Sequence, residues 1–403
     1  MQVRGGWQYL IVGFTCFSAL VAGFALKIGC PDLTGLTYPG LCYSDVTALY
    51  EGRFLASDAI PYLDFPPNGS YGDPGFFEYP VITGAVAFLA AALTDALFQY
   101  FALTAALLAL VALASGLLLT RSVGIAALRW AAAPILILYA FHNWDLLAVA
   151  CAVVGSILVT RGRNGWAAAW FGLGAAAKLY PALLILPLLL ERLWKRDVRG
   201  AVRVTIAGGL ASIAPNLVVA AANLDGWFAT YSFHAQRGAD LGSVWSLVLP
   251  ADTTPSVVNL ASGIAFGVSG LSILGFGWWR ARRDGTYPTL AVGGGLVVAS
   301  LLWGKVASPQ YAIWLLPSLI LLRVNAVWWL VWNAVAVLVY VVSFGVGVGA
   351  YDPTMAPSMI VSVAAVRAVA LAAIGVVLVR AAPVLSVRNQ PPPNGRRSLR
   401  CKP

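Results

Sequence analysis

The sequence predicts an all-α integral membrane protein with about 12 transmembrane helices. Of its 403 residues, 60% are hydrophobic and only 10% are charged, and the mean hydropathy is +0.81. Soluble domains usually carry about 25% charged residues, so this composition excludes an ordinary soluble fold. Two further observations predict the organisation: apolar runs recur along the whole chain, and basic residues gather in alternate connections between them.

The first apolar run covers about residues 7 to 26, and Arg4 is the only charge before it. It is long enough to span the membrane and lacks the features of a cleaved signal, so we expect a retained anchor helix. Further runs lie at about 99–120, 125–141, 146–160, 165–177, 179–190, 204–222, 256–279, 287–303, 310–322, 325–348 and 358–379. The segment from Pro80 to Thr94 would cover only ~20 Å of a ~30 Å hydrocarbon core. We interpret it as an interfacial or re-entrant helix.

Basic residues near span ends favour the cytoplasmic side, and this rule orients the chain. With both termini in the cytoplasm and residues 80–94 not spanning, 20 of the 26 Lys and Arg lie inside. If residues 80–94 spanned, only four would lie inside. The net charge of +10 then reflects inner loops and a tail facing anionic lipid, and we expect no nucleic-acid binding.

The domain organisation follows from this topology. We expect one transmembrane domain over residues 1–390 and a disordered, basic cytoplasmic tail over 391–403, with large extracytoplasmic loops at 28–98 and 223–255. The first loop is acidic and rich in proline and aromatic residues, and we interpret it as an active-site loop with juxtamembrane helices. A disulfide between Cys30 and Cys42 would stabilise it by roughly 3 kcal/mol. Two free thiols are the alternative.

Several acids are candidates for proton transfer. Asp45 could act as a general base, or could cap a helix over about residues 46–56. Glu78 is the strongest alternative base in the loop, which also contains Asp58, Asp64 and Asp73. Asp145 lies at the outer end of the fourth span, where it could position a substrate or orient a base. In the alternative interpretation, its neighbours His142 and Asn143 only form hydrogen bonds with the free backbone groups of a helix terminus.

Few cations lie on the outer side, so each is a candidate for binding a phosphate. They include Lys178, His234, Arg237 and Lys305, with Gln310 and Tyr311 as neutral donors. Lys178 lies between two short helices, where a buried charge needs a phosphate or an acidic partner. Alternatively, its aliphatic side chain could extend along the apolar surface and place the ammonium in water. Arg367 lies within the last span and must face protein or water, but we assign it no role.

Several short motifs occur in order along the chain: Tyr43-Ser44-Asp45, Glu78-Tyr79-Pro80, Asn143-Trp144-Asp145, Ala177-Lys178-Leu179-Tyr180-Pro181, then Lys305 followed by Ser308-Pro309-Gln310-Tyr311 and Trp314-Leu315-Leu316-Pro317. The order of these motifs resembles the GT-C glycosyltransferases, in particular the bacterial polyprenol-phosphate-mannose-dependent mannosyltransferases of the family 87 type. The resemblance covers nearly the whole chain. It implies a polytopic GT-C fold in the bacterial plasma membrane, with the active site facing the extracytoplasmic side.

The resemblance also implies the reaction. Mannose would pass, with inversion, from a polyprenyl-phosphate-mannose donor to a lipid-anchored glycan acceptor, and Asp45 would remove the acceptor proton. The donor phosphate would contact Lys178, His234, Arg237 and Lys305. The acceptor or sugar would contact Glu78, Tyr79, Asp145, Tyr180, Gln310 and Tyr311. We expect no cofactor, no metal ion and a monomer among membrane lipids.

Two alternatives remain open at this stage. A transferase of the same fold could take a polyprenyl-phosphate-pentose such as an arabinofuranosyl donor, because spacing does not reveal pocket shape. A (glyco)lipid transporter without chemistry is the second alternative. Transport favours polar groups deep in several spans and internal repeats, and the sequence shows neither clearly. No nucleotide-binding loop or zinc-ligand spacing appears either.

Overall fold

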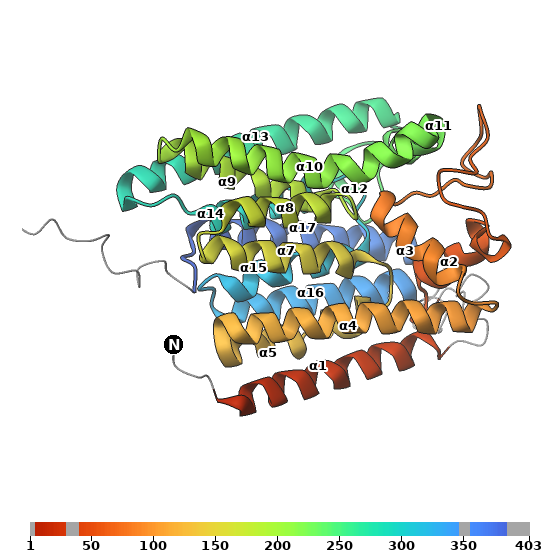
Figure 1. The fold of residues 1–403 in the computed structure, drawn as a ribbon, viewed down its shortest axis with the longest axis horizontal. Coiled ribbons are helices and arrows are strands. Elements are labelled where there is room, and N and C mark those ends of the chain that lie inside the picture. Colours follow the sequence, from red (N-terminus) through yellow and green to blue (C-terminus); the bar gives the residue numbers. More distant parts are fainter. Residues whose placement is uncertain (1–4, 30–39, 346–354, 385–403) are drawn as a thin grey trace, which may run out of the picture.

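The computed structural model of the chain describes residues 5–29, 40–345 and 355–384. Within these ranges the regular structure is helical, and the one β contact is an isolated bridge between Leu322 and Pro383. The helices run roughly side by side in a bundle (Figure 1). Six of them are long and apolar enough to cross a membrane. The chain is therefore a polytopic, all-helical membrane protein.

The long helices are α1 (Gly6–Lys27), α4 (Leu97–Val123), α10 (Val198–Ala222), α13 (Pro255–Asp284), α16 (Ala326–Phe344) and α17 (Ala356–Arg380). Shorter helices of the bundle are α5 (Leu128–Ala131), α6 (Pro134–Tyr139), α7 (Asp145–Thr160), α8 (Asn164–Ala175), α9 (Ile185–Trp194), α14 (Thr289–Trp303) and α15 (Leu316–Leu321). The connecting segments add α2 (Asp45–Gly52), α3 (Val81–Ala91), α11 (Leu224–Gln236) and α12 (Trp245–Val248). Four 3₁₀ helices complete the list: η1 (Leu55–Ser57), η2 (Gly124–Ala127), η3 (Tyr180–Leu184) and η4 (Pro309–Leu315).

Over the described residues, each predicted apolar run falls mainly on helix, but three runs are broken rather than continuous. Residues 125–141 form η2, α5 and α6; residues 179–190 begin as η3; and residues 310–322 divide into η4 and α15. Proline opens or lies within these pieces at Pro134, Pro181 and Pro317. Proline has no N–H to donate and clashes with a preceding turn, which explains the breaks. The count of twelve transmembrane helices stays a prediction.

The outer faces of the bundle are apolar. Leu210 on α10 is 63% exposed and Leu271 on α13 is 72% exposed. In water such a continuous apolar face would promote aggregation, whereas in lipid it is the expected surface. The interior is packed around large side chains that include Trp130, Trp144 and Trp332, and the indole N–H of Trp130 donates to the Ala112 carbonyl at 3.0 Å.

The helices α2, α3 and α11 gather at one end of the bundle, away from the end where α1 begins (Figure 1). At ~1.5 Å per residue, α3 is too short to span a ~30 Å core, as expected for residues 80–94. Its first turn is fixed by two hydrogen bonds to the chain before η3: Ile82 N donates to Ala176 O at 3.0 Å, and the Thr83 hydroxyl donates to Ala177 O at 2.8 Å. We call this region the loop end of the bundle.

The two ends of the bundle should face opposite sides of the membrane. Ser70 is exposed in the segment before α3, and Arg283 is exposed in the last turn of α13. We expect a membrane-impermeant thiol reagent to label a cysteine at position 70 from outside intact cells, and a cysteine at position 283 only after permeabilisation. The parent chain controls for labelling of its native cysteines. Labelling of both positions from one side would contradict the side assignment.

Candidate active site

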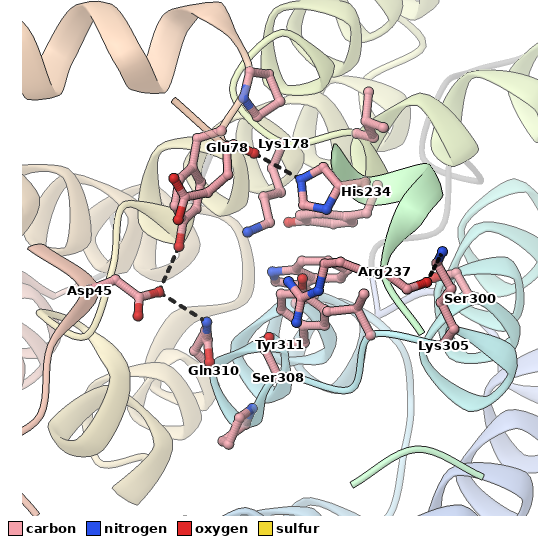
Figure 2. A pocket seen from close by; sticks show the side chains of 18 of the residues that line it. Asp45, Glu78, Lys178, His234, Arg237, Ser300, Lys305, Ser308, Gln310 and Tyr311 are labelled. Atoms are coloured by element: carbon pink, nitrogen blue, oxygen red, sulfur yellow. Dashed lines mark hydrogen bonds between the residues drawn. The ribbon is translucent and has the colours of Figure 1, made fainter. Parts of the chain in front are cut away.

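A cavity of about 770 Å³ opens at the loop end of the bundle. Its wall combines the loop before α3 with parts of α2, α11, α13 and α14 and with the segments around η3 and η4. The predicted site residues that line it are Asp45, Glu78, Tyr79, Lys178, Tyr180, His234, Arg237, Lys305, Gln310 and Tyr311. Asp145 lies behind the wall, in contact with Lys178. Residues spread over 265 positions thus meet in one place (Figure 2).

Asp45 is the first residue of α2, and its carboxylate faces the cavity (Figure 2). The cap of α2 is Ser44, which has extended backbone and accepts from Val46 N at 3.2 Å. The Asp45 Oδ2 atom instead accepts from the Tyr79 hydroxyl at 2.6 Å and from Gln310 Nε2 at 3.4 Å. The alternative interpretation of Asp45 as a helix cap is therefore wrong, because the preceding serine fills that role.

The helix expected over residues 46–56 is also shorter than predicted. α2 ends at Gly52, and Phe54 adopts a left-handed conformation with φ of 58° before η1 begins. Such a conformation cannot continue an α-helix and turns the chain toward the rest of the loop.

Burial raises the pKa of the Asp45 carboxyl above its usual value, against the opposing effects of the Tyr79 hydrogen bond and the nearby charge of Lys178. A carboxylate whose charge is poorly solvated takes up a proton more readily than an exposed one. This is the property that a general base for a sugar hydroxyl needs.

Glu78 lines the cavity but its carboxylate is already paired. Arg53 approaches it with two donors, Nε to Oε2 at 2.5 Å and Nη2 to Oε1 at 3.1 Å. The guanidinium also lies over the Phe76 ring, 5.0 Å from its centroid. Both oxygens of a carboxylate held in such a two-point contact are already engaged by the guanidinium, which leaves them less accessible to a substrate hydroxyl. The geometry therefore favours Asp45 over Glu78 for proton transfer.

The other candidate acids of the first loop, Asp58, Asp64 and Asp73, lie outside the cavity wall. Asp64 accepts from Ile60 N at 2.7 Å, and Asp73 accepts from Ser70 N at 2.6 Å, so each closes a local turn. Asp58 is exposed with φ of 61°. In the sequence these acids lie in the same loop as Asp45. Their positions alone therefore could not distinguish a structural role from a catalytic one.

Asp145 is the acidic partner of Lys178. The Lys178 Nζ lies 3.0 Å from Asp145 Oδ1, and Trp314 Nε1 donates to Asp145 Oδ2 at 2.8 Å. The Asp145 side chain is only 2% exposed and the Lys178 side chain 15%. The ammonium also lies over the Tyr79 ring at 4.4 Å and the Tyr311 ring at 5.0 Å from their centroids. Lys178 therefore carries its positive charge at the cavity wall, and Asp145, which lies behind the wall, neutralises that charge.

Aromatic rings stack beside this ion pair. Trp314 lies between Tyr180 and Tyr311, with ring centroids 4.3 Å and 4.1 Å apart. Within the described ranges, the Tyr180 hydroxyl and Gln310 Oε1 are buried without a hydrogen-bond partner. A buried donor or acceptor left free in a cavity wall is suited to a polar ligand such as a sugar. Trp314 was absent from the predicted site residues, although it follows Gln310 and Tyr311 at helical spacing.

The remaining candidate cations differ in how many contacts they already make with other protein groups. His234 Nε2 lies 2.8 Å from the Glu78 carbonyl, and burial lowers the pKa of His234, so its ring is neutral near pH ~7. Lys305 donates to the carbonyls of Arg237 at 2.7 Å and Ala235 at 3.2 Å, which fixes the end of α11. Arg237 contacts Asp240 at 3.0 Å with a partly exposed side chain. Arg237 is the most available of these groups for an anionic ligand.

Arg367 and the cysteines complete the set of sequence expectations. The buried Arg367 guanidinium donates to the carbonyls of Ala307 and Ser308, immediately before η4. It thus faces protein, as expected, and supports the segment that carries Gln310. Cys42 is disulfide-bonded, but Cys30 lies outside the described residues, so their pairing stays a prediction.

Comparison with known proteins decides the family. The model of glycosyltransferase family 87 matches residues 76–309, more than half of the chain. The chain belongs to glycosyltransferase family 87. This confirms the predicted family of GT-C glycosyltransferases. No curated protein matches the sequence.

One solved structure similar to this family 87 chain is the crystal structure of ArnT from Cupriavidus metallidurans bound to undecaprenyl phosphate. The two chains are 16% identical, and the alignment covers 93% of this chain and 77% of ArnT with a TM-score of 0.45. The family match itself begins after Asp45 and ends before Gln310. The case for these two residues therefore comes from their geometry and not from the family match.

Proposed function

We propose that this family 87 protein transfers mannose from a polyprenyl-phosphate-mannose donor to a lipid-anchored glycan acceptor. Transfer would take place at the extracytoplasmic face of a bacterial plasma membrane. The observation that supports this proposal best is the Asp45 carboxylate, held by Tyr79 and Gln310 at the wall of a cavity of about 770 Å³. Ligand-binding cavities in proteins typically have volumes of roughly 300–1,000 Å³, and this cavity lies within that range.

The cavity also fits a donor that is anchored in lipid. Part of its wall is Gly263 and Phe266 on α13, a helix whose outer face exposes Leu260 and Leu271 to the membrane. A phosphosugar in the cavity could therefore keep its hydrocarbon chain against the apolar side of the bundle. A water-soluble nucleotide-sugar would gain nothing from this arrangement.

The chemistry follows from the placement of the charges. The Asp45 carboxylate takes the proton of the acceptor hydroxyl while the acceptor oxygen forms its bond to the anomeric carbon. The bond from that carbon to the phosphate oxygen breaks, and the electron pair leaves with the polyprenyl phosphate. Lys178 and Arg237 lie at the cavity wall, where they would stabilise the departing phosphate. A single displacement of this kind inverts the anomeric configuration.

The donor can be tested directly with purified protein. Radiolabelled polyprenyl-phosphate-mannose and polyprenyl-phosphate-arabinofuranose would each be incubated with mixed envelope glycolipids, with Asp45→Asn as the blank. We expect label to enter glycolipid from the mannose donor only. Label from the pentose donor alone would overturn the mannose assignment. Movement of lipid between leaflets without consumption of either donor would support a transporter instead.

The pH dependence of transfer should report the titration of Asp45. The carboxylate is the active form, so activity is present above its pKa and is lost as the pH falls through it. Because burial raises this pKa, the loss should begin at a higher pH than an ordinary aspartate would produce. The measurement is kcat against pH with saturating donor. A profile that stays flat down to the usual aspartate range would contradict the assignment.

A further inference from the structure

A buried lysine lies behind the proposed base, and the mechanism above does not use it. Lys27 is the last residue of α1 and is only 2% exposed. In the described part of the chain, the ion pairs do not include Lys27. An ammonium at such depth is costly unless polar groups surround it. The polar groups that contact the Lys27 ammonium therefore show which segments of the chain this residue holds in place.

The Lys27 ammonium contacts three separate segments. Its Nζ donates to the Tyr43 carbonyl at 2.5 Å, to the Tyr340 hydroxyl at 3.0 Å and to His142 Nδ1 at 3.2 Å. Burial and the adjacent Lys27 charge hold the pKa of His142 well below its usual value, so this ring is neutral and can accept. The Tyr340 hydroxyl in turn donates to the Leu41 carbonyl. One cation thus joins α1, α16, the segment just before α2 and the turn before α7.

Two of these segments also hold Asp45. The Asp45 N–H donates to the His142 carbonyl at 2.7 Å, and the Ser44 hydroxyl donates to the Phe141 carbonyl at 2.7 Å. Tyr43 comes two residues before Asp45, and its carbonyl is the one that Lys27 binds. The direction in which the Asp45 side chain leaves α2 therefore depends on the same junction that Lys27 closes.

The charges around Asp45 give Lys27 a second effect. Tyr79, Gln310 and Tyr43 face the carboxylate with neutral groups, and Glu78 and Lys178 act on it through space. Glu78 is paired with Arg53, and Lys178 is paired with Asp145. Lys27 and Asp45 also interact electrostatically. Lys178 is the main cation acting on Asp45, and charged Lys27 adds to its effect in favouring ionised Asp45.

We infer that Lys27 is a positioning residue for Asp45. Its ammonium fixes the Tyr43 carbonyl and the His142 ring, which holds the first turn of α2 at the cavity wall, and its charge stabilises the carboxylate form of the base. This inference rests on the proposed function, because it assigns Lys27 a part in the same proton transfer.

The test compares two substitutions in the mannose-transfer assay. Lys27→Gln keeps a hydrogen-bond donor but removes the charge, and Lys27→Arg keeps the charge. Lys195→Met is the control, because Lys195, like Lys27, lies at the C-terminal end of a helix, here α9, and contacts Glu191 away from the cavity. We expect Lys27→Gln to lower kcat by about 10- to 100-fold, while KM for the donor stays within about threefold, because misplacing a reacting group affects chemistry more than binding.

The pH profile separates positioning from simple packing. For Lys27→Gln, the ratio of variant to wild-type kcat should fall a further ~3-fold or more between about pH 8 and about pH 6, because the base has lost a stabilising cation. Lys27→Arg should stay within about threefold of wild-type kcat at about pH 6, and Lys195→Met should match wild type at both pH values. An unchanged profile and kcat in folded Lys27→Gln would overturn the inference.

Three further outcomes keep the inference and the proposed function distinct. If Asp45→Asn is inactive while Lys27→Gln behaves as wild type, only the role of Lys27 fails. If Asp45→Asn is active, the role of Asp45 as base fails and the role of Lys27 fails with it; if the wild-type protein transfers no mannose, the proposed function fails. Should the Lys27 variants not fold, Tyr340→Phe removes one ammonium partner and leaves the lysine in place. It should lower kcat by at least about threefold, and no change would overturn the inference.

Discussion

Asp45→Asn should abolish glycosyl transfer, with a loss of about 100- to 10,000-fold in kcat, the usual contribution of a positioned general base. The asparagine oxygen can still accept from Tyr79 and Gln310, which both bind the same Oδ2 atom. The cavity shape should therefore be preserved, and binding of the lipid donor should remain near wild type. The measurements are single-turnover transfer and equilibrium binding of the labelled donor.

The stability of Asp45→Asn should distinguish lost chemistry from lost structure. Burial raises the pKa of Asp45 in the folded protein, so folding favours the protonated form. This contribution to stability is present at low pH and is lost as the pH rises through the folded pKa. At neutral pH a neutral asparagine avoids that penalty, and we expect the variant to unfold at or above the wild-type temperature.

The control for this variant is Asp58→Asn. Asp58 is an exposed acid of the same loop with φ of 61°, a conformation that asparagine tolerates well. It should leave transfer unchanged. Full activity in Asp45→Asn, or an equal loss in Asp58→Asn, would remove Asp45 from the mechanism.

Asp145→Asn should be the most destabilising single change in the site. It leaves the Lys178 ammonium without its carboxylate at a position where the side chain is 15% exposed. Breaking a buried ion pair from one side costs about 3–5 kcal/mol, because the remaining charge stays buried. We expect a lower unfolding temperature together with reduced transfer, since Lys178 would no longer be held against the Tyr79 and Tyr311 rings.

A double-mutant cycle isolates this ion pair. Asp145→Asn combined with Lys178→Met removes both charges, so most of the lost stability should return, whereas transfer should not, because a cation at the cavity wall is still missing. Unfolding temperatures of the two single variants and the double variant in detergent, with transfer measured in parallel, test both parts. Additive losses of stability in the double variant would show that the pair is not energetically coupled.

Much of the architecture could be predicted without coordinates. Hydropathy is a local property, so the apolar runs coincide with helices and the short segment at residues 80–94 forms the 11-residue helix α3. The site residues were also proposed from the sequence, because few cations lie on the predicted outer side and because the motifs around these residues resemble those of a known family. The broken runs were missed, since the effect of a proline inside an apolar segment depends on what packs around it.

The sequence by itself therefore determined the membrane class, the positions of the helical segments and the residues worth testing, since these depend on composition and spacing along the chain. The tertiary structure decided the role of each charge. It paired Glu78 with Arg53 and Asp145 with Lys178, and left Asp45 facing the cavity with Lys27 behind it. These partners are far apart in the chain, and a charge is neutralised only by groups within a few ångströms. The fold of the first loop and the packing of the helices together bring these groups into contact.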